Sequence, residues 1–299
     1  YENISLYFFG SKSIQKFNFS VGARLENNII SMEGYFNPVE KKIKKINSFN
    51  PSINILYELN KIDLFGNFSS GYETPTLNEL SATANQSGFN ENLKTIKSNT
   101  FEFGFANFRT DQTVNYSLRL FNISTSNEIT PYQLSDGLVL YRNAGKTIKR
   151  GAEIELGVKI TDQLNLDYSA SVGDYKFESF KFIENDFSNN IMPGIPQSNQ
   201  SIKLSYTNEN NYNLIVGLKR VGKMFADNAN ETEIDGYNSV SIKMSKNLKI
   251  FKTSMIPFIS IDNLLNEKYY DNIRINAFGS RFYEPASGIN IVGGLKINL

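Results

Sequence analysis

The stretch Ala152-Glu153-Ile154-Glu155-Leu156-Gly157-Val158-Lys159-Ile160 places apolar side chains at every second position, with charged residues or glycine between them. Successive side chains of a β-strand point to opposite faces, so this stretch predicts a strand with one apolar and one polar face. Helical spacing is hard to find over any long window. The sequence therefore predicts an all-β protein. The same alternation recurs in residues 17–26, 101–106, 114–120, 164–172, 202–206, 212–218, 240–244 and 291–299.

The connections between these predicted strands alternate in length. A soluble β-sandwich has no reason to keep that order, whereas a transmembrane barrel has short turns at one end and long loops at the other. Strands of ten residues or more also suit a tilted crossing of the bilayer. We therefore expect a transmembrane antiparallel β-barrel, with its apolar face toward lipid and its polar face toward the lumen. Short turns are expected near residues 10–13, 59–61, 109–112, 160–163, 207–210 and 247–252, and long loops near 27–47, 73–97, 128–146, 177–197, 222–236 and 263–287.

The number of predicted strands is about thirteen. The last strand should end on the short-turn side, and the first strand, near residues 3–9, should begin on the long-loop side. Bacterial barrels usually have an even number of strands and both termini on one side of the membrane. We therefore expect residues 1–299 to be the C-terminal part of a larger barrel. A further strand hidden within residues 129–141 would change the count by one.

The composition excludes several classes of function. Basic and acidic residues nearly balance, 31 against 30, so no nucleic-acid partner is expected. Cysteine and histidine are both absent, which removes thiol nucleophiles, Ser-His-Asp and Cys-His catalysis, disulfides and nearly all zinc sites. No pair of carboxylates has a base or nucleophile beside it. The sequence predicts neither an enzyme nor a resident metal or cofactor. The segment 227–233 offers oxygen ligands but lacks the glycine of a calcium loop, and a solvated acidic loop is the preferred interpretation.

Several motifs carry a family resemblance. Tyr72-Glu73-Thr74-Pro75-Thr76-Leu77-Asn78-Glu79-Leu80 resembles the aromatic-x-x-Pro-Thr-x-x-Glu-Leu signature of TonB-dependent outer-membrane receptors. Further likenesses are Asn90 to Ser98, Asn143-Ala144-Gly145 with Gly151-Ala152-Glu153, and Pro193-Gly194-Ile195-Pro196. The closing signature is matched by Ile261-Asp262-Asn263-Leu264-Leu265-Asn266-Glu267-Lys268-Tyr269 and Arg281-Phe282-Tyr283-Glu284-Pro285-Ala286. The chain departs from the family pattern at Leu265, Asn266, Ser287, Ile289 and Leu299.

The resemblance implies a 22-stranded barrel in the bacterial outer membrane, with a plug domain that this chain does not contain. Such a receptor imports a scarce ligand and is energised through TonB, which acts on the plug. The spacing Arg274-Ile275-Asn276…Arg281 is most similar to the ferric-siderophore and ferric-citrate branch, so a ferric siderophore is the favoured ligand. Iron would then travel inside the ligand and would not be a cofactor of the chain. We expect a monomer in contact with outer-membrane lipids.

Other functions stay open. Related receptors import cobalamin, haem, copper or glycans, although the lack of histidine argues mildly against haem. A passive porin-like channel would share the strand alternation, as would a barrel that serves as an adhesin or an assembly scaffold. A soluble all-β binding protein is the remaining alternative.

An anionic chelate requires arginine forks and tyrosine or amide donors at the outer mouth of the barrel. The alternative for each such residue is a polar side chain that ties the loops together. The candidate ligand-binding residues are Arg274, Asn276, Arg281 and Tyr283 in the last long loop, and Tyr132, Gln133 and Arg142 in the third.

Overall fold

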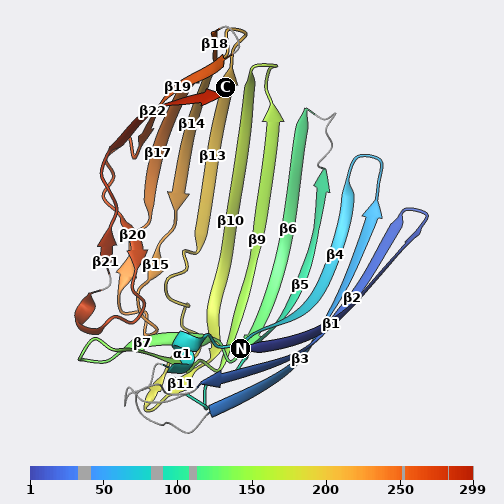
Figure 1. The fold of residues 1–299 in the computed structure, drawn as a ribbon, viewed down its shortest axis with the longest axis vertical. Helices are drawn as coiled ribbons and strands as arrows, with labels where there is room; N and C mark the ends of the chain where they lie inside the picture. The colour runs from blue at the N-terminus through green and yellow to red at the C-terminus, as the bar shows by residue number, and fades with distance from the viewer. Residues whose placement is uncertain (33–41, 82–89, 108–112, 251–252, 282, 299) are drawn as a thin grey trace.

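In the computed structural model, which describes residues 1–32, 42–81, 90–107, 113–250, 253–281 and 283–298, one large antiparallel sheet forms the body of the molecule (Figure 1). Its neighbouring strands follow one another in chain order, as in an up-and-down barrel wall. We call this sheet the wall. Its strands are β1 (Glu2–Ile14), β2 (Phe17–Met32), β3 (Lys42–Glu58), β4 (Asp63–Glu73), β5 (Ile96–Asn107), β6 (Val114–Ser126), β9 (Lys146–Lys159), β10 (Leu164–Ser179), β13 (Ser198–Thr207), β14 (Tyr212–Val221), β17 (Tyr237–Lys246), β18 (Leu248–Ile250), β19 (Thr253–Asp262) and β22 (Asn290–Asn298).

The strand count agrees with the sequence. The wall has fourteen labelled strands, but β17 and β18 pair with β19 in a single register, with Ser245 opposite Phe258 and Leu248 opposite Met255. They therefore act as one strand interrupted at Asn247, which leaves the thirteen strands expected. Within the described residues β1 and β22 do not pair with each other, so the sheet is an open wall.

Smaller elements fill the long connections at one end of the wall (Figure 1). We call the described parts of the five connections 74–95, 127–145, 180–197, 222–236 and 263–289 the rim. The segment that could have hidden a strand is a separate hairpin of the rim, so it adds none to the wall. The rim elements are α1 (Leu77–Ser81), β7 (Ile129–Gln133), β8 (Val139–Asn143), β11 (Lys181–Phe182), β12 (Asn185–Asp186), β15 (Met224–Phe225), β16 (Glu233–Ile234), β20 (Tyr270–Ile273), η1 (Phe278–Ser280) and β21 (Tyr283–Pro285).

The opposite end of the wall has short turns, and two of their predicted positions are wrong. In the turn expected near residues 247–252, Leu248–Ile250 form β18 and pair with β19, while residues 251 and 252 lie outside the described part of the chain. The turn expected near residues 10–13 is wrong, because Gly10 to Ser13 pair with Val21 to Asn18. The chain reverses at Gln15 and Lys16, where Gln15 takes a left-handed backbone (φ 53°) without the glycine or asparagine that usually signals such a turn. The expected turn at 109–112 and the middle of the expected loop at 27–47 lie outside the described residues.

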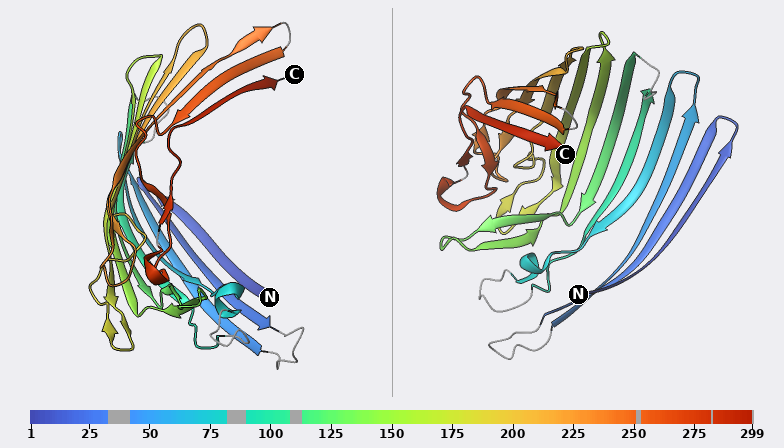
Figure 2. Two further views of the ribbon diagram at one scale, coloured as in Figure 1. Left: turned by 90° about the vertical axis from the view of Figure 1, so that its left-hand side faces the viewer. Right: turned by 45° about the horizontal axis from the view of Figure 1, so that its top comes forward.

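The two faces of the wall differ as the alternation predicts. In one row across four strands, Phe105 lies opposite Leu118, Leu118 opposite Ile154, and Ile154 opposite Ala170. One residue along each strand, the other face carries Ser117, Glu155 and Ser169. We call these the apolar face and the polar face. The sheet is curved like a trough (Figure 2), and the polar face is hollowed by about 600 Å³ between Glu153, Glu155, Ser169, Ser201 and Lys219.

The wall has no second layer of its own. The chain exposes 18991 Å², against about 12,800 Å² for a compact soluble monomer of this size. The described part of the chain holds no helix that is long and apolar enough to cross a membrane. Most of its buried apolar residues form three small clusters, all at the rim or at the strand ends that reach it. They are Ile30, Ile46, Leu80 and Leu93; Ala144, Phe177, Phe180 and Met192; and Ala226, Ile234 and Ala277.

Candidate ligand-binding rim

The motif that begins at Tyr72 builds the first rim cluster. Thr76 is the N-cap of α1: its Oγ1 accepts from the backbone N–H of Glu79 at 3.3 Å, and Glu79 Oε2 accepts from the N–H of Thr76 at 2.7 Å. This reciprocal pair is a capping box, which satisfies donors that a short helix would otherwise leave free. The capped turn places Leu80, fully buried, against Leu93 and two wall residues.

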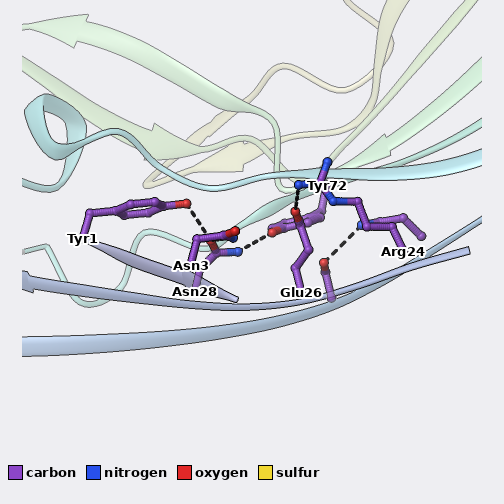
Figure 3. A network of polar contacts seen from close by, with 8 residues as sticks. Tyr1, Asn3, Arg24, Glu26, Asn28 and Tyr72 are labelled. Atoms are coloured by element: carbon purple, nitrogen blue, oxygen red, sulfur yellow. Dashed lines mark hydrogen bonds and ion pairs between the residues drawn. The ribbon is translucent and has the colours of Figure 1, made fainter. Parts of the chain in front are cut away.

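Tyr72 anchors the same cluster to the wall (Figure 3). Its hydroxyl accepts from Nδ2 of the buried Asn28, whose Oδ1 also accepts from Asn3 Nδ2 at 2.6 Å and from the Tyr1 hydroxyl. Beside it, Arg24 forms an ion pair with Glu26. The residues of this motif thus join α1 to strands β1, β2 and β4, and their contacts in the structure are with other rim and wall residues.

Two further motifs also make their contacts with other rim and wall residues. Asn143 donates from Nδ2 to the carbonyls of Lys94 (2.9 Å) and Asn127 (2.8 Å), and its Oδ1 accepts from the Lys94 N–H at 2.7 Å. At Gly145 a Cβ would lie 2.1 Å from the Ser179 carbonyl oxygen, so only glycine fits there.

In the closing motif, Asn263 has a left-handed backbone (φ 52°) and is buried. Its Nδ2 donates to the carbonyls of Glu267 at 2.9 Å and Ser287 at 3.1 Å. The last connection is therefore tied at its base, where it leaves and re-enters the wall.

The acidic segment expected at 227–233 is a turn that Asp227 holds together. Both carboxylate oxygens of Asp227 accept backbone N–H groups, from Glu231 at 3.0 Å and Thr232 at 2.8 Å. Among the described residues there is no group of three acidic side chains suited to hold a metal ion.

Tyr132 and Arg142 come together on the β7–β8 hairpin. The Arg142 guanidinium lies 4.7 Å from the Tyr132 ring centre, 5.4 Å from Phe180 and 3.5 Å from Phe182. Burial lowers the pKa of Arg142, and the neighbouring Tyr132 partly offsets this. The Nε atom is buried without a hydrogen-bond partner, and no carboxylate pairs with Arg142 in the described part of the chain. The result is a half-buried cation held by three aromatic rings.

Gln133 and Asn276 join two connections that lie far apart in sequence. Gln133 Oε1 accepts from the N–H of Phe278 at 3.1 Å, and its Nε2 donates to the Gly137 carbonyl at 2.9 Å. Asn276 Nδ2 donates to the carbonyl of Pro131 at 3.0 Å, while its Oδ1 accepts from the Asn228 N–H at 2.9 Å. These two side chains hold the β7–β8 hairpin against the last connection.

Arg274, Arg281 and Tyr283 lie on the more exposed part of the last connection. Arg274 Nε lies 2.7 Å from Glu284 Oε1 in an ion pair across the β20–β21 hairpin. A hydrogen bond from Asn272 and then the Arg274 charge lower the pKa of Glu284. Tyr283 stacks on Tyr270 with ring centres 4.4 Å apart, and Arg281 Nε donates to the Phe278 carbonyl at 3.2 Å. The outer part of this connection therefore carries two exposed arginines and a stacked pair of tyrosines.

Sequence reasoning missed two sets of rim residues. Phe180 and Phe182 complete the cage around Arg142, although they stood in a segment interpreted as a polar loop. Asn190 Nδ2 donates to the Asn228 carbonyl at 2.9 Å, and Asn230 Oδ1 accepts from the Ile191 N–H at 2.7 Å. The rim connections 180–197 and 222–236 are therefore also joined. No local pattern in residues 227–230 reveals partners some forty residues away.

The seven candidate residues therefore fall into three groups: a caged cation, a pair of inter-loop ties and an exposed hairpin. The structure brings all of them to one end of the wall. Their contact with a ligand stays a prediction.

Comparison with known proteins decides the family. The model of the family described as "TonB dependent receptor-like, beta-barrel" matches residues 1–264 of the chain. The chain belongs to this family. It is therefore part of the barrel of a TonB-dependent receptor, a non-enzymatic transporter class of the bacterial outer membrane, and the apolar face of its wall faces lipid.

Individual relatives are distant. The ferrioxamine receptor of Yersinia enterocolitica is 24% identical over 182 residues, which are 59% of this chain and 24% of that protein. Among solved structures, the ferric-catecholate import receptor Fiu of E. coli K12 has a TM-score of 0.74 at 19% identity, covering 99% of this chain and 44% of Fiu. The copper transporter OprC reaches 0.79 at 14% identity, covering 99% of this chain and 47% of OprC. The chain thus spans less than half the length of these relatives, and the likenesses establish its fold.

Proposed function

We propose that residues 1–299 are the C-terminal part of a receptor barrel, and that the complete receptor imports a ferric siderophore energised by TonB. TonB would act through a plug region outside this chain. The family membership supports the receptor class, and the printed names of two relatives, a ferrioxamine receptor and a ferric-catecholate import receptor, favour iron chelates. The copper transporter OprC shares this fold, so the fold alone does not identify the transported ligand.

The observation that carries the proposal is the presence of three arginines, Arg142, Arg274 and Arg281, on the rim. Arg142 is half-buried without a carboxylate among the described residues, and Arg281 is exposed on the connection that also carries the Tyr270–Tyr283 stack. Arg274 is held by Glu284, which keeps its guanidinium oriented across the hairpin. Ferric chelates commonly carry negative charge and oxygen acceptors, which such arginines bind through charge-assisted hydrogen bonds.

Uptake of labelled iron tests the proposal. Cells that lack other siderophore receptors and express the full-length protein are given one iron-labelled siderophore at a time, of the hydroxamate, catecholate or carboxylate class. We expect accumulation of one class, lost when TonB is removed. Accumulation that does not require TonB would support a passive channel instead. Uptake of copper or of no iron chelate would reject the siderophore assignment.

The ligand residues are tested in the same cells. Removing the charges of the last connection with Arg274→Gln and Arg281→Gln should weaken ferric-siderophore binding by about ten-fold or more, the scale of losing charge-assisted hydrogen bonds. The control is Lys181→Gln, which removes an exposed rim charge paired with Asp186. Unchanged affinity in the double variant would take both arginines out of the site.

A further inference from the structure

A cavity of about 660 Å³ lies between the rim connections 222–236 and 263–289. We call this cavity the tyrosine pocket. Its lining combines aromatic rings with charged side chains, among them Tyr269, Tyr270, Tyr283, Asp235, Glu267 and Lys268. Of these, only Tyr283 is a candidate ligand residue from the sequence, so the pocket is a site that the motifs do not reveal.

The tyrosine rings of the pocket are held in place by their neighbours. Tyr270 stacks on Tyr283 with ring centres 4.4 Å apart, and Tyr269 stacks on Tyr237 with ring centres 3.9 Å apart. The Tyr269 carbonyl accepts from the Ala286 N–H at 3.0 Å, which joins the two sides of the last connection. The rings are therefore positioned before a ligand arrives, and this lowers the entropic cost of binding.

The backbone that carries the carboxylates is also fixed. At Gly236 a Cβ would lie 2.5 Å from the Val221 carbonyl oxygen, so the chain next to Asp235 packs directly against the end of β14. The Glu267 N–H donates to Asn263 Oδ1 at 2.9 Å, and the Glu267 carbonyl accepts from Asn263 Nδ2 at 2.9 Å. Both carboxylates thus extend from an ordered backbone.

The charges that line the pocket do not balance. A third carboxylate of the lining, Glu233, is paired with Lys223, whose Nζ lies 2.8 Å from Glu233 Oε2. Asp235 and Glu267 are exposed, and in the described part of the chain neither forms an ion pair, with Lys268 or with any other cation. Two unpaired carboxylates beside one lysine leave an excess of negative charge at the pocket.

We propose that the tyrosine pocket binds an organic ammonium group. The negative faces of aromatic rings attract cations, and nearby carboxylates add direct charge attraction. A metal ion fits less well, because the described residues hold no group of three acidic side chains suited to one. The ammonium group belongs either to the transported molecule or to a free amine, and the chemistry of recognition is the same for both. The proposal does not depend on the transported ligand being an iron chelate.

The charge requirement is tested with choline and its neutral analogue, in which a carbon atom replaces the nitrogen. Each is titrated into the full-length protein in detergent, and binding is followed by ligand-observed NMR. We expect choline to bind about ten-fold more tightly than the analogue. Asp235→Asn with Glu267→Gln should abolish that preference. The matched control, Glu184→Gln with Glu209→Gln, removes two exposed acids outside the pocket and should keep it.

Substitutions of Tyr270 test the contribution of the rings. Tyr270→Phe keeps an aromatic face and should bind choline within about two-fold of the parent, whereas Tyr270→Leu should bind it about five-fold more weakly. The variant Asp235→Asn with Glu267→Gln changes only exposed side chains, so it decides the proposal even if Tyr270→Leu disturbs the hairpin.

Three outcomes would overturn the proposal: choline that binds no better than its analogue, equal losses in the two double variants, or displacement of choline by glucose at comparable concentration. A ferric chelate with a primary amine and its N-acetylated form then separate the two sources. Preference of the parent for the amine form assigns the ammonium group to the transported molecule, and equal binding of both forms assigns it to a free amine. Absence of iron-chelate uptake would reject the siderophore proposal and leave the choline result unchanged.

Discussion

The wall and the rim are stabilised by different interactions. The wall is a single layer whose backbone groups pair from strand to strand, and many of its large apolar side chains, such as Phe103 and Val172, are more than half exposed. The rim holds its own small cores, in which Leu80 and Phe180 are almost fully buried. The wall thus depends on lipid to cover its apolar face, whereas the rim packs as a water-soluble protein does.

This difference separates what each region can reveal about function. The motifs of the family lie where the wall meets the rim, and Thr76, Asn143 and Asn263 serve there as a helix cap and as loop ties. Those residues identify the architecture. The ligand must be read from the outer part of the rim, around Arg142 and the β20–β21 hairpin.

A charge placed in the apolar band should give the largest effect. Ala170 and Ser169 are adjacent on β10 but lie on opposite faces. Ala170→Lys should destabilise the full-length protein folded into lipid vesicles by about 2 to 4 kcal/mol, because the lysine enters the hydrocarbon region. Ser169→Lys lies opposite Glu155 on the polar face and should cost little. Equal costs for the two, measured by denaturant unfolding from vesicles, would contradict the assignment of faces.

A cavity in the rim should act more locally. Leu80→Ala should cost about 2 to 3 kcal/mol, because Leu80 is fully buried in a cluster of only four residues. Hydrogen exchange should quicken in α1 and its partners, while the protection of β9 and β10 stays unchanged. Leu77→Ala removes an exposed leucine from the same helix and should change neither region. Loss of protection along the wall in Leu80→Ala would show that the two regions are not independent.

The smallest expected effect concerns the β20–β21 hairpin. Because the pKa of Glu284 is lowered in the folded protein, its ionised form stabilises the hairpin, and this contribution is complete above the ordinary glutamate value of 4.5. The contribution is lost as the pH falls through the lowered pKa. Hairpin exchange, corrected for its intrinsic pH dependence, should therefore rise below pH 4.5, and Glu284→Gln should remove that rise. A parent protein whose hairpin keeps its protection in acid would contradict the role of the Arg274 pair.

Sequence reasoning was most successful for the wall. Its period of two is a local property, so residues 152–160 and their equivalents revealed the strands, the two faces and the alternation of short and long connections. The predicted position of the first turn was wrong, because Gln15 adopts a left-handed backbone without the glycine or asparagine that would signal it. The rim could be predicted only in part, because its ties are long-range: the bonds of Asn276 and Gln133 to their partners span 145 residues.

The most direct test of the central claim is the environment of successive side chains along one wall strand. The chain has no cysteine, so single cysteines at each position of 165–172 on β10 can carry a fluorescent label without background. In the full-length protein reconstituted into vesicles, brominated lipid should quench the label at 166, 168, 170 and 172, and a water-soluble quencher should act at the positions between them. Quenching without a period of two, or lipid quenching on the face of Glu153 and Ser169, would contradict the account.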